Sequence, residues 1–126
     1  MKALLLVAHG SRRKQSNDEV ILLAEKIKNK CSRQYSIVNA AFLELSETLI
    51  PDGIKQCVTD GASSIIVLPY FLNSGRHVVE DIPNIINDCI VQYPNIDIRL
   101  APHLGASSLM IDLLISSAET ANTVEL

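Results

Sequence analysis

Four short apolar runs alternate with four stretches of helical periodicity along this chain, and the alternation limits the folds open to it. The runs cover residues 3–8, 36–43, 65–68 and 96–101. Runs of this length are typical of buried strands, and the stretches that follow them carry apolar residues three and four positions apart. A strand–helix unit repeated four times predicts a parallel sheet with helices on both faces.

Right-handed crossovers between parallel strands leave few topologies for such a sheet. We expect the flavodoxin-like α/β class with strand order 2-1-3-4, formed by residues 1–126 as a single domain. Strands one and three are then neighbours, and the switch point of the sheet lies between their carboxyl ends. Ligands bind at such switch points in open α/β sheets.

Local signals indicate where the helices begin and end. Starts are expected at three places: Ser16 or Asn17, then Ser46 with Glu47, then Asp81 with Pro83 in the first turn. Gly61 is expected to end the second helix. The fourth helix is predicted from Gly105 to about Ala118, with three leucines facing the core: Leu109, Leu113 and Leu114. Residues 120–126 have no periodicity, and we expect them to fray.

The composition excludes several classes of protein. With a net charge of −3 the chain lacks the basic footprint of a nucleic-acid-binding protein. No stretch approaches the roughly 20 apolar residues that cross a bilayer, and the first apolar run is too short for a signal peptide. The cysteines are odd in number and lack a C-x-x-C pair, so we expect reduced structural thiols in a cytosolic protein: Cys31, Cys57 and Cys89.

Polar side chains follow the strands at their carboxyl ends. His9 comes after the first run and His77 after the third, so these two are expected to face one another across the switch point, within reach of a shared ion. Glu44 follows the second run and His103 the fourth. Taken alone, Glu44 is equally consistent with an acidic residue at a helix start. His103 alone is equally consistent with a surface histidine or with a hydrogen-bonded histidine of the core.

Imidazole and carboxylate ligands suit iron, cobalt and nickel. Two histidines and one glutamate are fewer than the four ligands of a closed structural site. The metal would therefore either be transferred to another molecule or take part in a reaction at the site. Imidazoles are also competent bases near neutral pH. Metal delivery combined with proton removal is what inserting a metal into a tetrapyrrole requires.

Four stretches carry a family resemblance: LLLVAHGSR at 4–12, AAFLEL at 40–45, LPYFLNSGRHVVEDIP at 68–83 and APHLG at 101–105. On these motifs the chain resembles the small class II tetrapyrrole chelatases of the sirohydrochlorin type, the short cobaltochelatase family. The resemblance implies a cytoplasmic enzyme of cobalamin or siroheme synthesis that inserts Co²⁺, or alternatively Fe²⁺ or Ni²⁺, into sirohydrochlorin. The metal is then a substrate, and no permanently bound cofactor is expected.

The resemblance also implies roles for individual residues. His9 would be the proton acceptor and a metal ligand, and His77 the second ligand. Six residues would contact the macrocycle: Glu44, Leu72, Asn73, Ser74, Gly75 and Arg76. Longer relatives fuse two such domains, so a single copy is expected to form a homodimer. One departure is that relatives often carry a His-Pro pair where this chain has Ala106-Ser107-Ser108, while His103 precedes the LG.

Two other functions remain open from the residues. A phosphate-handling histidine enzyme would explain H-G-S after a strand, although such enzymes place an arginine before the histidine and Ala8 stands there. A non-catalytic carrier of metal or tetrapyrrole would share the same fold. The basic run of Arg12, Arg13 and Lys14 fits either a solvated helix start or a rim that meets an anionic ligand.

Overall fold

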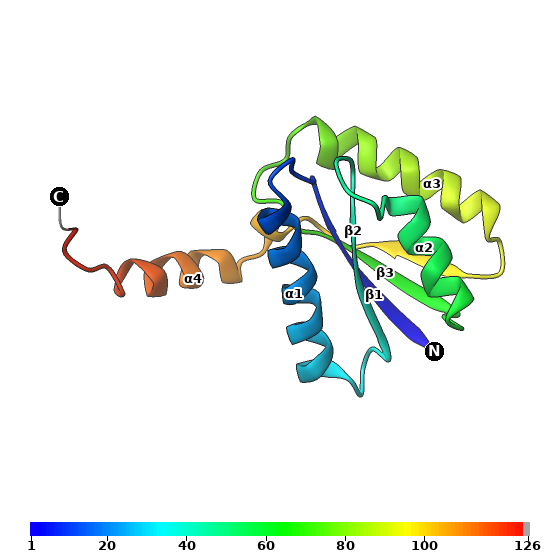
Figure 1. The fold of residues 1–126 in the computed structure, drawn as a ribbon, viewed down its shortest axis with the longest axis horizontal. Helices are drawn as coiled ribbons and strands as arrows, with labels where there is room; N and C mark the ends of the chain where they lie inside the picture. Colours follow the sequence, from blue (N-terminus) through cyan, green and yellow to red (C-terminus); the bar gives the residue numbers. More distant parts are fainter. Residues whose placement is uncertain (125–126) are drawn as a thin grey trace.

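A four-stranded parallel sheet forms the centre of the computed structural model, which describes residues 1–124 (Figure 1). The strands are β1 (Lys2–Ala8), β2 (Ile37–Phe42), β3 (Ser64–Pro69) and β4 (Asp97–Leu100), and their order is β2-β1-β3-β4. This order confirms the flavodoxin-like topology. In the register of the sheet, Val7 of β1 lies between Ala41 of β2 and Pro69 of β3, so the carboxyl ends of these three strands lie side by side.

Helices cover the two faces of the sheet unequally (Figure 1). The helix α1 (Lys14–Cys31) lies on one face, and α2 (Ile50–Thr59) and α3 (Ile82–Gln92) lie on the other. Because side chains alternate along a strand, Leu5 and Val7 enter the core under α2 and α3, whereas Leu4 and Leu6 pack towards α1. The larger core therefore lies on the side with two helices.

The helix α4 (Leu109–Ala118) extends away from the sheet (Figure 1), so the prediction of an inward-facing fourth helix is wrong. Its three predicted core leucines are between 55% and 72% exposed. The helix also starts later than predicted, because Leu104–Ala106 forms a short 3₁₀ turn, η2. The Gly105 N–H donates to the Phe71 carbonyl at 3.0 Å, which fixes η2 beside the loop after β3 and points the following residues outward.

The first two helix starts also differ from the prediction. The helix α1 begins at Lys14, and its N-cap residue Arg13 makes no side-chain capping bond. The helix α2 begins at Ile50 and not at Ser46–Glu47, since the chain there first returns to the sheet, where the Phe42 N–H donates to the Thr48 carbonyl. The predicted end of α2 is confirmed, because Gly61 follows the helix with a φ of +100°.

A π-helical turn, η1 (His77–Asp81), precedes α3, and the Ile82 N–H donates to the His77 carbonyl five residues back. Asp81 has helical dihedral angles and makes no capping bond, so its predicted role as a cap is wrong. The carboxylate turns to His77 instead. Single π turns are frequent at functional sites, because the extra residue redirects side chains.

The remaining expectations concern the cysteines, the C-terminus and the membrane. Cys57 and Cys89 are buried and Cys31 is half-buried, all as free thiols, and burial raises the pKa of both buried thiols. Residues 121–124 have no regular structure, whereas residues 125 and 126 of the segment expected to fray lie outside the described residues. No helix within residues 1–124 is long and apolar enough to cross a membrane.

Candidate functional site

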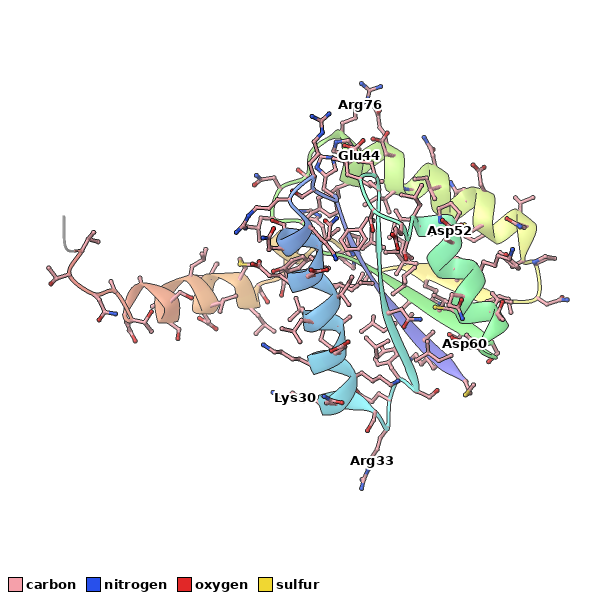
Figure 2. All side chains as sticks on the ribbon, in the orientation of Figure 1. Lys30, Arg33, Glu44, Asp52, Asp60 and Arg76 are labelled. Atoms are coloured by element: carbon pink, nitrogen blue, oxygen red, sulfur yellow. The ribbon has the colours of Figure 1, made fainter. Side chains whose placement is uncertain are left out.

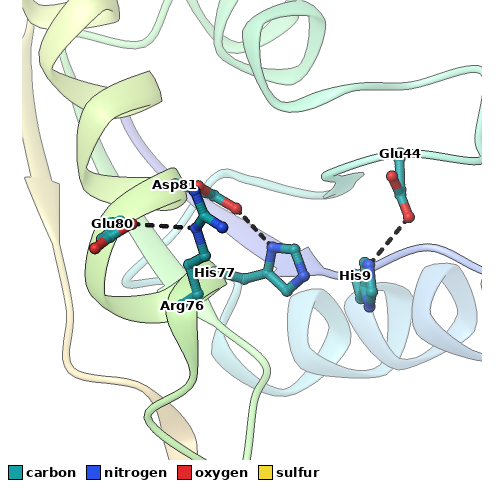
Figure 3. A network of polar contacts seen from close by, with 6 residues as sticks. All are labelled: His9, Glu44, Arg76, His77, Glu80 and Asp81. Atoms are coloured by element: carbon teal, nitrogen blue, oxygen red, sulfur yellow. Dashed lines mark hydrogen bonds and ion pairs between the residues drawn. The ribbon is translucent and has the colours of Figure 1, made fainter.

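The two histidines after β1 and β3 meet at the carboxyl edge of the sheet (Figure 3). The ring centroids of His9 and His77 are 4.6 Å apart, and the ring planes are inclined by 43°. Both side chains are about half exposed, at 48% and 45%. The predicted juxtaposition of these imidazoles is confirmed, since β1 and β3 are neighbours.

Glu44 joins this pair from the loop after β2. Its Oε1 lies 3.1 Å from Nε2 of His9. An ionised carboxylate only accepts hydrogen bonds, so Nε2 of His9 donates, and in the neutral ring Nδ1 keeps a free lone pair. Figure 2 shows Glu44 and Arg76 at the same end of the sheet, with Arg33 at the opposite end. The prediction that Glu44 belongs to this edge is therefore confirmed.

The backbone brings His9 and Glu44 together at Gly10. This residue has a φ of +98°, and a Cβ placed on it would lie 1.8 Å from the Glu44 carbonyl oxygen. The Glu44 N–H donates to the His9 carbonyl at 3.1 Å, and the Leu43 N–H donates to the Ala8 carbonyl at 3.0 Å. The close approach of the two loops therefore depends on a residue without a side chain.

Asn17 ties the same two loops together from α1. Its Oδ1 accepts from the Ser11 N–H at 2.9 Å, and its Nδ2 donates to the carbonyls of Ser11 at 3.0 Å and Leu45 at 2.9 Å. Leu45 has a φ of +56°, so this bond holds a conformation that L-residues seldom adopt. Sequence reasoning treated Asn17 as a possible cap and missed this bridge, for which the sequence contains no signal.

His77 is oriented by a carboxylate of its own. Its Nδ1 lies 2.7 Å from Oδ2 of Asp81, four residues later in the helical turn (Figure 3). The carboxylate accepts, so Nδ1 donates, and in the neutral ring Nε2 keeps its lone pair. Sequence reasoning assigned Asp81 to a cap, although the four-residue spacing within a helix was a signal for this contact.

A cavity of about 360 Å³ lies against this group of side chains. Glu44, His77, Asp81 and Asn84 line it with polar atoms, and Leu43 and Ile85 with apolar ones. A second, larger hollow of about 470 Å³ lies at the start of α1 and includes Arg12 and Lys14. Asn84, one turn after Asp81, was not predicted from the sequence.

The other predicted residues occupy different positions. Leu72, Asn73, Ser74 and Gly75 form an exposed loop between β3 and η1, and Arg76 follows it with its side chain 81% exposed. The Arg76 Nε donates to Glu80 Oε2 at 3.2 Å, one turn away. Within residues 1–124, His103 starts η2 and is not part of the polar contacts that join the histidines to their carboxylates.

The chemistry of this group follows from its two carboxylate–imidazole pairs. In each pair one ring nitrogen donates to a carboxylate and the other has a free lone pair, which can accept a proton or bind a transition metal. No set of three or more histidine, cysteine, aspartate or glutamate side chains among the described residues is arranged to hold a metal ion. A closed, tightly binding metal site is therefore not formed by residues 1–124.

Comparison with known proteins places the chain in a family. A profile of the family named CbiX matches residues 3–121. A chloroplastic sirohydrochlorin ferrochelatase of Arabidopsis thaliana is 37% identical over 88% of this chain and 48% of the relative. A sirohydrochlorin cobaltochelatase of Sulfolobus acidocaldarius is 34% identical over 99% of this chain and 96% of the relative.

A solved structure supports the same family assignment as the sequence relatives. The sirohydrochlorin chelatase SirB of Bacillus subtilis subspecies spizizenii, in complex with cobalt, superposes with a TM-score of 0.81 and 31% identity over 94% of this chain. The match covers 50% of SirB, so this chain spans about half the length of SirB, as it does of the Arabidopsis relative. With the fold, the paired histidines and the match over residues 3–121 in agreement, the chain belongs to the CbiX family.

Proposed function

We propose that this chain inserts a divalent metal ion into sirohydrochlorin, with Co²⁺ as the preferred ion and Fe²⁺ or Ni²⁺ as alternatives. The observation that carries the proposal is the pair of imidazoles at the carboxyl edge, whose ring centroids are 4.6 Å apart, each with a carboxylate on one nitrogen. The names of the relatives support the substrate, since they are sirohydrochlorin cobaltochelatases and ferrochelatases. The ion is a substrate, and no resident cofactor is part of the proposal.

The two imidazoles have complementary roles in this scheme. Metal insertion displaces two pyrrole protons, so a base has to lie beside the site where the ion enters. His9 ligates the incoming ion through Nδ1 and, as the ion passes to the pyrrole nitrogens, accepts one of the two displaced protons on that same nitrogen. Glu44 stabilises the imidazolium that forms, because its carboxylate lies 3.1 Å from the ring, and the second proton passes to solvent, to which the His9 side chain is 48% exposed. His77 is the second ligand, and Asp81 holds its ring so that Nε2 is available to the ion.

The incomplete ligand set is consistent with a metal that is delivered and not retained. Fewer than three protein ligands within residues 1–124 leave coordination positions for water and for the pyrrole nitrogens. The ion is then bound weakly enough to leave, and the macrocycle supplies the ligands that the protein lacks. For the macrocycle to supply these ligands, it has to lie over His9 and His77, next to Glu44 and the loop of residues 72–76.

The polycarboxylated substrate calls for a positive rim. Arg12 and Arg13 are exposed at the start of α1, directly after the loop that carries His9. Arg76 is exposed beside His77, although Glu80 offsets part of its charge. In this proposal the rim attracts the macrocycle and takes no part in proton transfer or metal ligation. Exposed charges suit that role, since they are screened within about 8–10 Å.

The proposal includes a cytoplasmic location and a homodimer. The dimer is supported by the length comparison, because the matching region of SirB is 50% of that chain and a second copy of this domain would supply a comparable length. Light scattering tests the dimer, and fractionation of cells tests the location.

The function is tested by anaerobic insertion of Co²⁺, Fe²⁺ and Ni²⁺ into sirohydrochlorin, monitored through the change in absorbance of the macrocycle. We expect many turnovers per chain, fastest with Co²⁺, and a loss of roughly 10²-fold or more in His9→Ala and in His77→Ala. His103→Ala is the matched control and should retain turnover. Product limited to one equivalent per chain would indicate a carrier, and phosphatase activity without insertion would indicate the phosphate-handling alternative.

A further inference from the structure

The larger hollow of the molecule lies beside the histidines and is not used by the proton transfer or metal ligation proposed above. It has a volume of about 470 Å³ and is formed by the start of α1 and the loop after β2. Its walls continue the two loops of the site, because Ser11 follows His9 by two residues and Leu45 follows Glu44 directly. Asn17, which joins these loops, also lines it. The hollow is therefore fixed in position relative to the imidazoles.

Two exposed apolar side chains line this hollow. Ile21 of α1 is 43% exposed, and Leu45 of the loop is 47% exposed. Leu45 also has a φ of +56°, which is held by the bond of 2.9 Å from the Asn17 amide to its carbonyl. Backbone strain of this kind costs free energy and is concentrated at active sites and ligand clamps. These side chains therefore offer an apolar surface to the alkyl part of a ligand.

Three hydroxyl groups in the hollow can each donate a hydrogen bond. Ser11, Ser46 and Thr48 are half-buried there. The Ser11 Oγ accepts from the Arg13 N–H at 3.1 Å, and the Ser46 Oγ accepts from the Thr48 N–H at 3.3 Å. None of the hydrogen bonds within residues 1–124 has one of these three hydroxyls as its donor. A group that only accepts hydrogen bonds, as a carboxylate does, would pair with them.

Arg12 and Lys14 add positive charge to the same hollow. Neither takes part in the ion pairs formed among the described residues. A guanidinium binds both oxygens of a carboxylate at once, whereas an ammonium acts as a point charge, so Arg12 is the better anchor. Asp18 and Glu47 also line the hollow and balance the two cations. This balance favours a carboxylate, with one negative charge, over a phosphate group, which carries about two.

We propose that this hollow binds one carboxylate-bearing side chain of the macrocycle, called here the carboxylate arm. Arg12 binds the carboxylate, the three hydroxyl groups donate to it, and Ile21 and Leu45 contact the alkyl part of the arm. The inference rests on the proposed function, since it takes sirohydrochlorin as the ligand.

The positions of the loops place the hollow within reach of such an arm. An extended chain spans at most about 3.6 Å per residue, so the Cα atom of Ser11 lies within about 7 Å of that of His9. Leu45 is adjacent to Glu44 in the chain, on the other side of the same pair of loops. A macrocycle that lies over the imidazoles therefore has its periphery, where the carboxylates are attached, beside the hollow.

An anchored arm would define how the macrocycle is rotated over the two histidines. The four pyrrole nitrogens present similar ligands to the ion, so contacts at the centre of the ring do not select one rotation. Contacts at the periphery do, and they also disfavour a macrocycle without a carboxylate at this position, because the donors of the hollow would be left unpaired. Arg12 is thus a specificity-determining residue, whereas Arg13 does not line the hollow and belongs to the rim alone.

The first test measures the Kd of metal-free sirohydrochlorin from the fluorescence of the macrocycle, so that no metal insertion is needed. We expect Arg12→Gln to raise the Kd about 10-fold or more, because a charge-assisted hydrogen bond is lost, and the increase should persist at high salt. Arg13→Gln is the same change one position later. It should raise the Kd only about two-fold at low salt and less at high salt, as an exposed charge does. Equal effects of the two substitutions would overturn the inference.

The second test removes one hydroxyl group with little change of shape. Thr48→Val replaces the hydroxyl by a methyl group and keeps the bond from the backbone N–H of this residue to the Ser46 Oγ. We expect the Kd to rise about 3- to 10-fold, with the urea midpoint unchanged. Thr59→Val, the same change at the last residue of α2, is the matched control and should keep the native Kd. A native Kd in Thr48→Val would overturn the proposal.

The same measurements separate this inference from the proposed function. If the native chain binds and metallates sirohydrochlorin, and Arg12→Gln and Thr48→Val do so equally well, the inference is overturned and the function stands. If the native chain neither binds nor metallates sirohydrochlorin, both are overturned. Propionate alone tests for a free carboxylate as the occupant. Tight binding of propionate that Arg12→Gln abolishes, with unchanged affinity for sirohydrochlorin, would overturn the assignment to the macrocycle.

Discussion

Replacement of Gly10 by alanine tests how strictly the site depends on the backbone between His9 and Glu44. The substitution adds a Cβ at a φ of +98°, which costs about 1–2 kcal/mol for an L-residue. The same Cβ would lie 1.8 Å from the Glu44 carbonyl oxygen, about 1.5 Å inside ordinary contact. The two loops have to separate by roughly that distance, and the hydrogen bond from the Glu44 N–H to the His9 carbonyl is then lost, at about 1 kcal/mol.

The expected result for Gly10→Ala is therefore a decrease of about 2–3 kcal/mol in the free energy of unfolding. The separation also stretches the contact of 3.1 Å between Nε2 of His9 and Oε1 of Glu44 beyond hydrogen-bonding distance. Turnover should fall together with stability, because His9 loses its carboxylate. Urea unfolding followed by circular dichroism, at one fixed protein concentration, gives the first quantity, and sirohydrochlorin metallation gives the second.

Two other glycines provide matched controls. Gly61 has a similar φ of +100°, but the nearest atom to its Cβ is the flexible Met1 Cε at 2.9 Å, far from the site. Gly61→Ala should therefore lose about 1–2 kcal/mol of stability and keep normal turnover. Gly75 has nothing within 4 Å of its Cβ, so Gly75→Ala should be close to native in stability. A Gly10→Ala protein with the stability and turnover of Gly61→Ala would refute this reasoning.

Four further predictions follow from other contacts. Asp81→Asn should lower turnover about 10–100-fold without loss of helix content, since the ring of the neighbouring histidine loses its carboxylate; native turnover would exclude a positioning role. Asn17→Ala should lower the free energy of unfolding by about 1–3 kcal/mol and reduce turnover, whereas loss of stability alone would limit this amide to a structural role. Replacing Arg12 and Arg13 together by Gln should raise KM and flatten its salt dependence, with kcat unchanged; a collapse of kcat would place them in the chemistry. Because burial raises the pKa of the Cys57 and Cys89 thiols above their ordinary 9.0, the contribution of these two thiols to stability should be constant below that pH and fall as the pH rises above it, and urea midpoints between about pH 8 and pH 10 would measure this.

The sheet order and the meeting of His9 with His77 were predictable, because the repeated strand–helix pattern leaves few topologies open. The commonest of these for a small sheet places strands one and three side by side, and the residues that follow them then share one edge. The position of Glu44 at this edge was predictable by the same rule. These positions depend on backbone topology, which short apolar runs and their spacing encode directly.

Contacts that depend on side-chain direction were not predictable in the same way. An aspartate before a helical stretch is typical of a cap, and the four-residue spacing to His77 indicates a contact only if the helical turn already includes His77, as the π turn does. The direction of α4 is a similar case. Apolar periodicity indicates that a helix is to be buried, but it does not say against which surface, and Leu113 is 55% exposed.

The two carboxylate–imidazole pairs also differ in the length of chain that each has to bring together. The partners are 35 residues apart in His9–Glu44 and four apart in His77–Asp81. The second pair is completed within one helical turn, whereas the first needs the whole β1–α1–β2 unit in place. Partial opening of residues 43–49 therefore abolishes one pair and preserves the other, so proton acceptance is lost before the second ligand is. Amide hydrogen exchange distinguishes them, because the Glu44 N–H binds the His9 carbonyl and the Ile82 N–H binds the His77 carbonyl.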